Sequence, residues 1–214
     1  AEMGFLGINI PTQYGGLGLN HLDAVVVLEE LAKTSIAAAW PVFEASFGPT
    51  LAIAHMGNDQ LKREVLPRVC SGELMVAISM SEPEAGTALT DLKTKAENLG
   101  DELLINGQKR WSSGAGHANG YVVYVRMSDA PGAAGIGAVF VEKDVSGFTF
   151  GKPEQHMGFG GVPSADMFFD DVRVPAHHML IGAGGFKHLM DAFDLERCGN
   201  TTMSLAIAQS AFDY

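Results

Sequence analysis

Residues 79–87 read SMSEPEAGT, and at this stretch the character of the chain changes. The stretch follows a run of strand-forming residues, 74–79, and Pro83 ends that run because proline has no N–H to donate to a strand ladder. Small residues and a glycine come next, and they favour a loop. A strand that ends in this way leaves successive backbone groups and small hydroxyls free to face a ligand.

The sequence before this stretch is helical. Residues 4–20 are rich in glycine and predict an irregular crossing of the surface. Helix formers, caps and breakers then predict three helical runs: 21–34, 35–55 with a break or bend near Pro41 and at Gly48-Pro49, and 58 to about 69, starting at the Asn58 cap.

The sequence after residue 73 changes to short runs of strand formers separated by turn residues. Asn106-Gly107, between two such runs, predicts a β-hairpin. Runs with no helix between them favour an antiparallel barrel or sandwich. The predicted strands are 74–79, 91–97, 102–105, 108–112, 121–127, 136–142 and 165–174.

Helical character returns after Gly184-Gly185 and continues without a stop signal to the last residues, so we expect both ends of the chain to be cut from a longer protein. The predicted fold class is α+β: a helical N-terminal part, an antiparallel β-barrel in the middle, and the start of a C-terminal helical bundle. The predicted domains are 1–72, 73–183 and 184–214.

Composition excludes several classes of protein. With 47% hydrophobic residues the chain is not disordered, and a formal net charge of −11 argues against a sequence-independent grip on nucleic acid. The two cysteines lie far apart, which suggests neither a disulfide framework nor a zinc finger and fits a reducing compartment. Residues 36–56 are apolar but interrupted by Pro, Gly, Glu and His, so we expect no membrane span there. Without a signal peptide, we expect a bacterial cytoplasmic or mitochondrial matrix protein that is not secreted.

Common catalytic and nucleotide-binding motifs are absent. The glycines nowhere form a complete G-x-G-x-x-G or Walker pattern, and neither G-x-S-x-G nor H-E-x-x-H occurs. His177-His178 are neighbours. On an extended segment their side chains would point to opposite faces, so the pair predicts a poor chelator and we expect no metal site.

Five motifs, in order, resemble the acyl-CoA dehydrogenase family. The resemblance implies an FAD enzyme that oxidises an acyl-CoA thioester to the 2,3-enoyl-CoA, passes electrons to an electron-transferring flavoprotein, and forms a homotetramer or homodimer. The chain departs from the family pattern at Ala88, where the family usually has Asp. The motifs are residues 7–16, 81–87, 106–114, 168–175 and 193–197.

The resemblance also assigns roles to particular residues. Trp111 would pack against the flavin ring and Ser113 would place a hydroxyl near its reactive nitrogen, although a tryptophan in such a motif is, taken alone, more often a core residue. The predicted cofactor-binding residues are Ile78, Ser79, Met80, Ser81, Trp111, Ser112 and Ser113. The predicted acyl-CoA contacts are Thr87, Asp194 and Arg197.

Glu196 is the candidate catalytic base. It shares a helical stripe with largely apolar neighbours, and burial of an unpartnered carboxylate should raise its pKa toward the range that a general base needs. In a subset of the family, similar to the isovaleryl and long-chain branches, the base directly precedes the helix arginine, as Glu196 does. The stripe is Leu189, Phe193, Glu196, Asn200, Met203 and Ile207.

Other interpretations remain open. Glu196 could be a solvated helix-face residue, with the base in a later segment that this chain lacks. A flavin oxidase or monooxygenase of the same fold would use oxygen as acceptor, and a non-catalytic truncated paralogue would act only as a binding or assembly partner.

Overall fold

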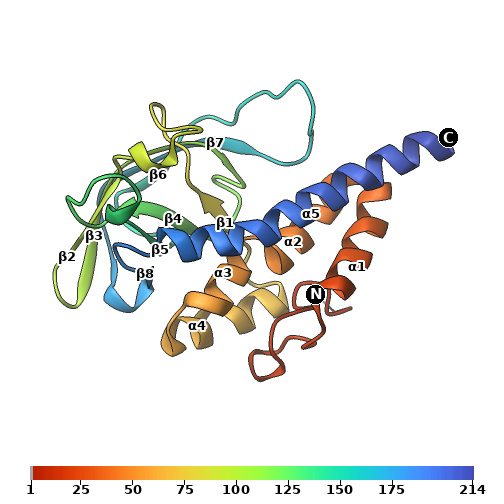
Figure 1. The fold of residues 1–214 in the computed structure, drawn as a ribbon, viewed down its shortest axis with the longest axis horizontal. Coiled ribbons are helices and arrows are strands. Elements are labelled where there is room, and N and C mark those ends of the chain that lie inside the picture. The colour runs from red at the N-terminus through yellow and green to blue at the C-terminus, as the bar shows by residue number, and fades with distance from the viewer. Residues whose placement is uncertain (1) are drawn as a thin grey trace.

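The computed structural model describes residues 2–214. An N-terminal group of helices packs against a β-sheet, and a long final helix runs alongside both (Figure 1). The helical group begins with a short 3₁₀ turn, Thr12–Tyr14, and continues with α1 (His21–Thr34), α2 (Ile36–Ser46), α3 (Pro49–Met56) and α4 (Asp59–Ser71). The three predicted helical runs are therefore confirmed.

Capping and breaking residues set the helix bounds. The Asn20 side chain accepts hydrogen bonds from the backbone N–H groups of Leu22 and Asp23, and the Asp23 carboxylate accepts one from the Asn20 N–H, which completes a capping box at α1. The expected break at Gly48-Pro49 is confirmed, with Pro49 as the first residue of α3. The helix is not broken at Pro41, which lies inside α2, where burial of the surrounding side chains outweighs one lost backbone hydrogen bond.

The apolar run over residues 36–56 has a mean hydropathy of 1.2 and the length of a membrane span, but 72% of its most apolar window is buried inside the protein. This run forms two separate helices, α2 and α3, and not one continuous helix. Its apolar side chains therefore belong to the protein core.

The middle of the chain forms one mixed sheet in the order β6-β7-β3-β2-β4-β5-β8, with β1 added beside β4. The α+β class is confirmed, but the sheet is not wholly antiparallel as predicted, because β1 and β2 both pair with β4 in parallel. The strands are β1 (Val76–Ser79), β2 (Lys95–Asn98), β3 (Glu102–Ser113), β4 (Gly120–Arg126), β5 (Ile136–Glu142), β6 (Phe148–Phe150), β7 (Ser164–Pro175) and β8 (Met179–Ile181).

The predicted hairpin at Asn106-Gly107 is wrong, because β3 passes through these residues without a turn. The Asn106 side chain instead hydrogen-bonds Asp171 on β7 in both directions, through its Nδ2 at 2.9 Å and its Oδ1 at 2.8 Å. The register between β3 and β7 shifts here, so the Asn-Gly pair forms a bulge. The real turn between β2 and β3 lies at Gly100, whose φ is 99°.

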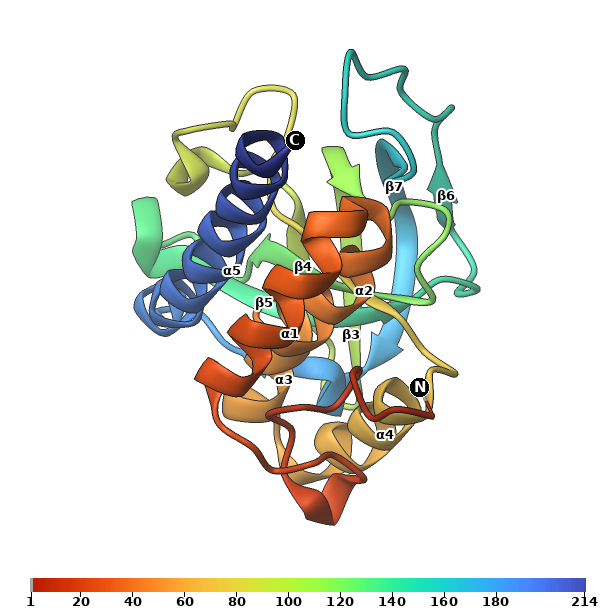
Figure 2. The same ribbon diagram turned by 90° about the vertical axis from the view of Figure 1, so that its right-hand side faces the viewer.

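Strands β4 and β5 are buried on both faces. Alternate residues of β4, Tyr121 and Val123, face the interior formed with β3 and β7, whereas Val122 and Tyr124 face the helices. The final helix, α5 (Phe186–Asp213), lies beside α1 and α2 (Figure 2). The end of β1, the middle of α2 and one turn of α5 thereby meet.

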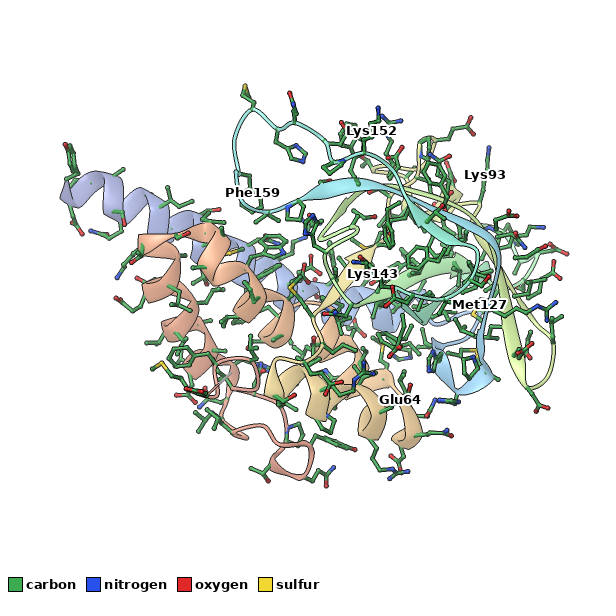
Figure 3. The ribbon with its side chains drawn as sticks, turned by 180° about the vertical axis from the view of Figure 1, so that it is seen from behind. Glu64, Lys93, Met127, Lys143, Lys152 and Phe159 are labelled. Carbon is green, nitrogen blue, oxygen red and sulfur yellow. The ribbon has the colours of Figure 1, made fainter. Side chains whose placement is uncertain are left out.

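The expectation that His177 and His178 point to opposite faces is wrong. Pro175 ends β7, and residues 176–178 form a 3₁₀ turn, so the two rings lie 4.7 Å apart between centroids. Both rings reach Glu64 on α4, which is labelled in Figure 3. Strand geometry does not apply in such a turn.

Candidate functional site

A cavity of about 190 Å³ lies where α2, the end of β1, β3 and α5 meet. Most of the residues predicted to bind cofactor or act as base line it together, although they come from three separate segments. These are Ile78, Met80, Ser81, Trp111, Ser112, Ser113 and Glu196. The sequence interpretation gave no site role to the other lining residues, although Arg110 lies in the third motif and Asn200 on the predicted stripe; they are Trp40, Phe43, Glu44, Arg110 and Asn200.

The end of β1 is fixed to β3 by hydrogen bonds. The hydroxyl oxygens of Ser79 and Ser112 lie 2.6 Å apart in the interior, and the Arg110 backbone N–H donates to the Ser81 carbonyl oxygen at 2.8 Å. Ser79 is therefore bonded beneath the cavity lining, while Ser81 faces the cavity. This arrangement fixes the backbone at Ser81 beside the site.

A buried ion pair lies under the same loop. Lys109 Nζ donates to Glu82 Oε1 at 2.8 Å and to the Met80 carbonyl oxygen at 3.0 Å. Burial lowers the pKa of Lys109 to about 8, although Glu82 opposes that shift. Burial alone would raise the pKa of Glu82, but Lys109 and two backbone amides, those of Lys93 and Thr94, bring it below its usual range. The pair locks the loop after β1 to the middle of β3.

Trp111 has an unusual backbone. Its φ is 60°, rare for a bulky residue, and the register of β3 on β7 shifts between Lys109 and Ser112. The bulge turns the indole outward, where it is 52% exposed with the Arg110 guanidinium 4.8 Å from the ring centroid. Such strain persists only where the surrounding structure holds it, and it concentrates at functional sites.

Trp111 and Ser113 also border an outer hollow of about 430 Å³, formed with the loop between β6 and β7. This loop rises above the sheet in Figure 1, and Figure 3 labels its Phe159. The Phe159 ring packs edge-on against Trp40 of α2, with 5.2 Å between centroids. The loop thus encloses one side of the site.

Glu196 reaches the cavity from α5 and is 9% exposed. Burial raises its pKa to about 7, while Arg197 next to it acts in the opposite direction. The predicted rise of the pKa is therefore confirmed. A carboxyl group with this pKa is partly ionised at neutral pH, as a general base must be.

The predicted stripe around Glu196 is partly wrong. Leu189 and Met203 are buried as expected, but Ile207 is exposed. In the second half of the helix, the small residues that directly precede the predicted stripe positions are buried. A Cβ added to one of them, Gly199, would come within 2.9 Å of the Phe43 ring. Close helix approach, which favours small residues, sets this face. The buried residues of α5 are Leu189, Glu196, Gly199, Thr202, Met203 and Ala206.

Glu44 is a second carboxyl group in the same cavity. It is 2% exposed, and burial together with the facing Glu196 raises its pKa well above the usual range. It also borders an apolar hollow of about 150 Å³ between α2, α4 and β1. The available signal was a lone glutamate within the apolar run 36–56, because a carboxyl group buried there should, like that of Glu196, have a raised pKa.

The predicted acyl-CoA contacts lie outside the cavity lining. Thr87, Asp194 and Arg197 are all exposed, and the Arg197 guanidinium lies over the Phe193 ring at 4.5 Å from its centroid. Their roles toward acyl-CoA stay predictions.

The donor set of the cavity fits a flavin. Ser81 and Ser113 offer hydroxyls, and the half-exposed face of Trp111 offers a flat apolar surface. Polar groups of this kind can hydrogen-bond the edge of a flavin ring, and a flat apolar side chain can pack against its face. The residues present therefore suit this cofactor.

Family models decide what kind of protein this is. The acyl-CoA dehydrogenase N-terminal domain matches residues 1–73, and the acyl-CoA dehydrogenase middle domain matches residues 77–172. The chain belongs to the acyl-CoA dehydrogenase family. As a family member it contains the N-terminal and middle domains and spans about half the length of the relatives it matches.

Similar proteins of this family carry different names. 3-Sulfinopropanoyl-CoA desulfinase of Variovorax paradoxus is 34% identical over 99% of this chain and 55% of its own length. Mitochondrial isovaleryl-CoA dehydrogenase of Pongo abelii is 34% identical over 100% of this chain and 51% of its own length.

Solved structures match this fold over nearly the whole chain. Butyryl-CoA dehydrogenase from Megasphaera elsdenii matches with a TM-score of 0.93 at 31% identity, covering 98% of this chain and 56% of that one. A structure described under the electron transferring flavoprotein of Acidaminococcus fermentans matches with a TM-score of 0.94 at 33% identity, with the same coverage of 98% and 56%.

Proposed function

We propose that this family member oxidises an acyl-CoA thioester to the 2,3-enoyl-CoA with FAD, and that Glu196 is the base. One observation carries the proposal: a buried carboxyl group with a pKa of about 7 lines the same cavity as Ser81, Trp111 and Ser113. A base with such a pKa can take a proton at neutral pH and hold it until release.

The division of roles follows from the lining. Glu196 accepts the substrate's α-proton on its carboxylate, and the apolar walls of Phe43 and Ile78 limit access of water to it. Ser81, Ser113 and Trp111 hold and orient the cofactor. A bound flavin supplies the acceptor for the hydride that leaves the β-carbon. The two departures create the 2,3 double bond.

The substrate class is broader than one acyl chain. One similar protein is named a desulfinase and another a dehydrogenase, and both names contain an acyl-CoA thioester. We therefore propose acyl-CoA as the substrate class without choosing the acyl group. An electron-transferring flavoprotein as acceptor, a homotetramer or homodimer, and a bacterial cytoplasmic or mitochondrial matrix location complete the proposal by analogy with the family.

The test is a visible spectrum of the full-length, FAD-loaded protein, titrated without oxygen against straight-chain, branched and 3-sulfinopropanoyl thioesters of CoA. The proposal predicts that at least one thioester bleaches the flavin and that the enoyl-CoA accumulates. Rapid reoxidation in air would favour the oxidase alternative. A protein that is colourless and does not take up FAD would support the non-catalytic paralogue.

A further inference from the structure

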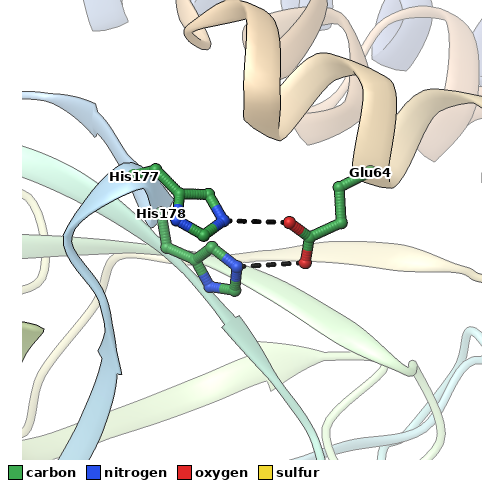
Figure 4. Close-up of side chains that lie close together, drawn as sticks. All are labelled: Glu64, His177 and His178. Atoms are coloured by element: carbon green, nitrogen blue, oxygen red, sulfur yellow. Dashed lines mark hydrogen bonds and ion pairs between the residues drawn. The ribbon is translucent and has the colours of Figure 1, made fainter.

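A cluster of metal-ligating side chains lies away from the flavin cavity, at the junction of the helical part and the sheet. It consists of Glu64 on α4 and of His177 and His178 in the turn before β8 (Figure 4). The three side chains offer one carboxylate and two imidazole donors, and their donor atoms all lie within 4.8 Å of one another. None of the three lines the flavin cavity.

The geometry inside the cluster is specific. His177 Nε2 lies 3.0 Å from Glu64 Oε2, and His178 Nε2 lies 3.1 Å from Glu64 Oε1. Each carboxylate oxygen therefore faces one ring nitrogen, and both rings present the same type of atom to a common point. In a tetrahedral zinc site with bonds of about 2.0–2.2 Å, neighbouring ligand atoms lie roughly 3.4 Å apart, so the side chains need only small shifts.

The backbone around the cluster is fixed before any ion binds. Asn58 caps α4 through its Oδ1, which accepts from the Leu61 N–H at 3.0 Å, and its Nδ2 donates to the His177 carbonyl oxygen at 2.6 Å. The His178 ring packs edge-on against Phe140 on β5, with 5.4 Å between centroids. One residue thus sets both the start of the helix that carries Glu64 and the position of the histidine turn.

Accessibility is graded across the cluster. His178 is 7% exposed at its side chain, whereas those of His177 and Glu64 are 25% and 34% exposed. An ion can enter from the side of Glu64 and His177 and still have a ligand anchored in the core. Two imidazoles and one carboxylate with an open side also match the donor set of known two-histidine, one-carboxylate zinc sites.

We propose that Glu64, His177 and His178 form a binding site for a borderline divalent transition metal ion of the Zn²⁺ type, with water in the remaining position. Imidazole donors favour such ions over Mg²⁺ and Ca²⁺, which prefer oxygen ligands. Because the ligands come from segments 113 and 114 residues apart, the ion would link α4 to the sheet. Its first consequence would be stabilisation of that junction.

The experiment is calorimetric titration of the full-length, FAD-loaded protein with Zn²⁺, and separately with Mg²⁺. We expect one Zn²⁺ per chain and no comparable heat with Mg²⁺. Glu64→Gln and His177→Gln should each weaken Zn²⁺ binding more than about tenfold, because even loss of an outer partner of a metal ligand costs that much. His188→Gln is the matched control, since the His188 side chain is 68% exposed on α5 and is not one of the three cluster residues.

A second measurement covers the case in which a variant folds poorly. Thermal unfolding should shift to higher temperature when Zn²⁺ is added to the wild type, return on addition of a chelator, and not shift in Glu64→Gln. Wild-type protein that takes up no Zn²⁺, or Zn²⁺ binding of equal affinity in the Glu64→Gln and His177→Gln variants, would overturn the proposal. Neither result bears on the flavin chemistry, because the two sites share no residue.

Discussion

Lys109 Nζ lies 2.8 Å from Glu82 Oε1, and the two side chains are 0% and 6% exposed. Glu82 belongs to the stretch that ends the first strand, and Lys109 belongs to the middle of β3. The same ammonium group also holds the Met80 carbonyl oxygen. The pair therefore links the loop that carries Ser81 to the strand that carries Trp111, and so fixes two walls of the candidate site.

Replacing this lysine should be costly. Lys109→Met leaves Glu82 buried and without its cation, which we expect to lower the free energy of unfolding by about 3–5 kcal/mol. Lys93→Met is the matched control: the side chains of its ion pair with Glu84 are 74% and 75% exposed, and the pair should contribute nothing measurable. Urea unfolding of both variants measures the difference. Equal stability of the two variants would show that the buried pair has no special role.

The pH dependence of stability follows from Glu196. Its pKa in the folded chain, about 7, lies above the value of about 4.3 expected when unfolded, so the folded state holds the proton more tightly. Its contribution to stability is therefore fully present below about pH 4 and is lost as the pH rises through 7. Two neighbouring charged groups are the same in both proteins compared below: Glu44, which faces Glu196, and Arg197, which lowers the pKa of Glu196.

Glu196→Gln removes this titration. The wild type should lose unfolding free energy as the pH rises from 5 to 8, whereas the variant lacks this loss. The difference between the two proteins should therefore change by about 2 kcal/mol in favour of the variant over this range. Urea unfolding of both proteins at the two pH values checks this, with Asp191→Asn, an exposed carboxylate on the same helix, as control. Parallel pH curves for wild type and Glu196→Gln would contradict the raised pKa.

Glu44 borders two hollows, because it lines both the cavity that contains Glu196 and the apolar hollow between α2, α4 and β1. If acyl chains bind in the first, Glu44→Ala should open the way to the second. We expect kcat/KM to shift toward longer straight acyl chains by about tenfold or more. Glu44→Gln keeps the volume and should keep the chain-length preference. An unchanged preference in Glu44→Ala would place the acyl tail elsewhere.

The face of α5 gives a further test. Ala206 is fully buried against the helical part, whereas Ala208 two residues later is exposed. Ala206→Val overpacks the interface and should lower the free energy of unfolding by about 1–3 kcal/mol. Ala208→Val makes the same chemical change on the open face and should have a much smaller effect. Equal losses at both positions would mean that another face of the helix is packed.

Local signals predicted most of the fold. Capping residues and breakers fixed the helices, because Asn20, Asn58 and Gly48-Pro49 act through their own backbone neighbourhood. The Asn106-Gly107 hairpin failed for the opposite reason: whether Asn-Gly forms a turn or a bulge depended on Asp171, a partner 65 residues away. Parallel pairing of β1 and β2 with β4 is likewise non-local.

The sequence predicted the residues of the candidate site that belong to recognisable motifs. It did not predict features that depend on contacts between distant parts of the chain. Ser81, Trp111, Ser113 and Glu196 were named from the sequence, and they line one cavity. The buried face of α5 was placed partly wrongly because small residues contact the neighbouring helix there. Small residues contribute little to a pattern of hydrophobic residues along a helix, so the pattern did not reveal them. The histidine turn was misjudged because a 3₁₀ turn replaced the expected extended backbone.

The proposed chemistry depends most on Glu196 acting as the base of a flavin site. The most direct test is anaerobic titration of FAD-loaded Glu196→Gln with an acyl-CoA that bleaches the wild type, followed by visible absorption. We predict that the variant keeps FAD and still binds the thioester but does not bleach, whereas Asp191→Asn bleaches normally. Bleaching of Glu196→Gln at the wild-type rate would show that Glu196 is not the base, and that another group, such as the neighbouring Glu44 or a residue outside residues 1–214, takes the proton.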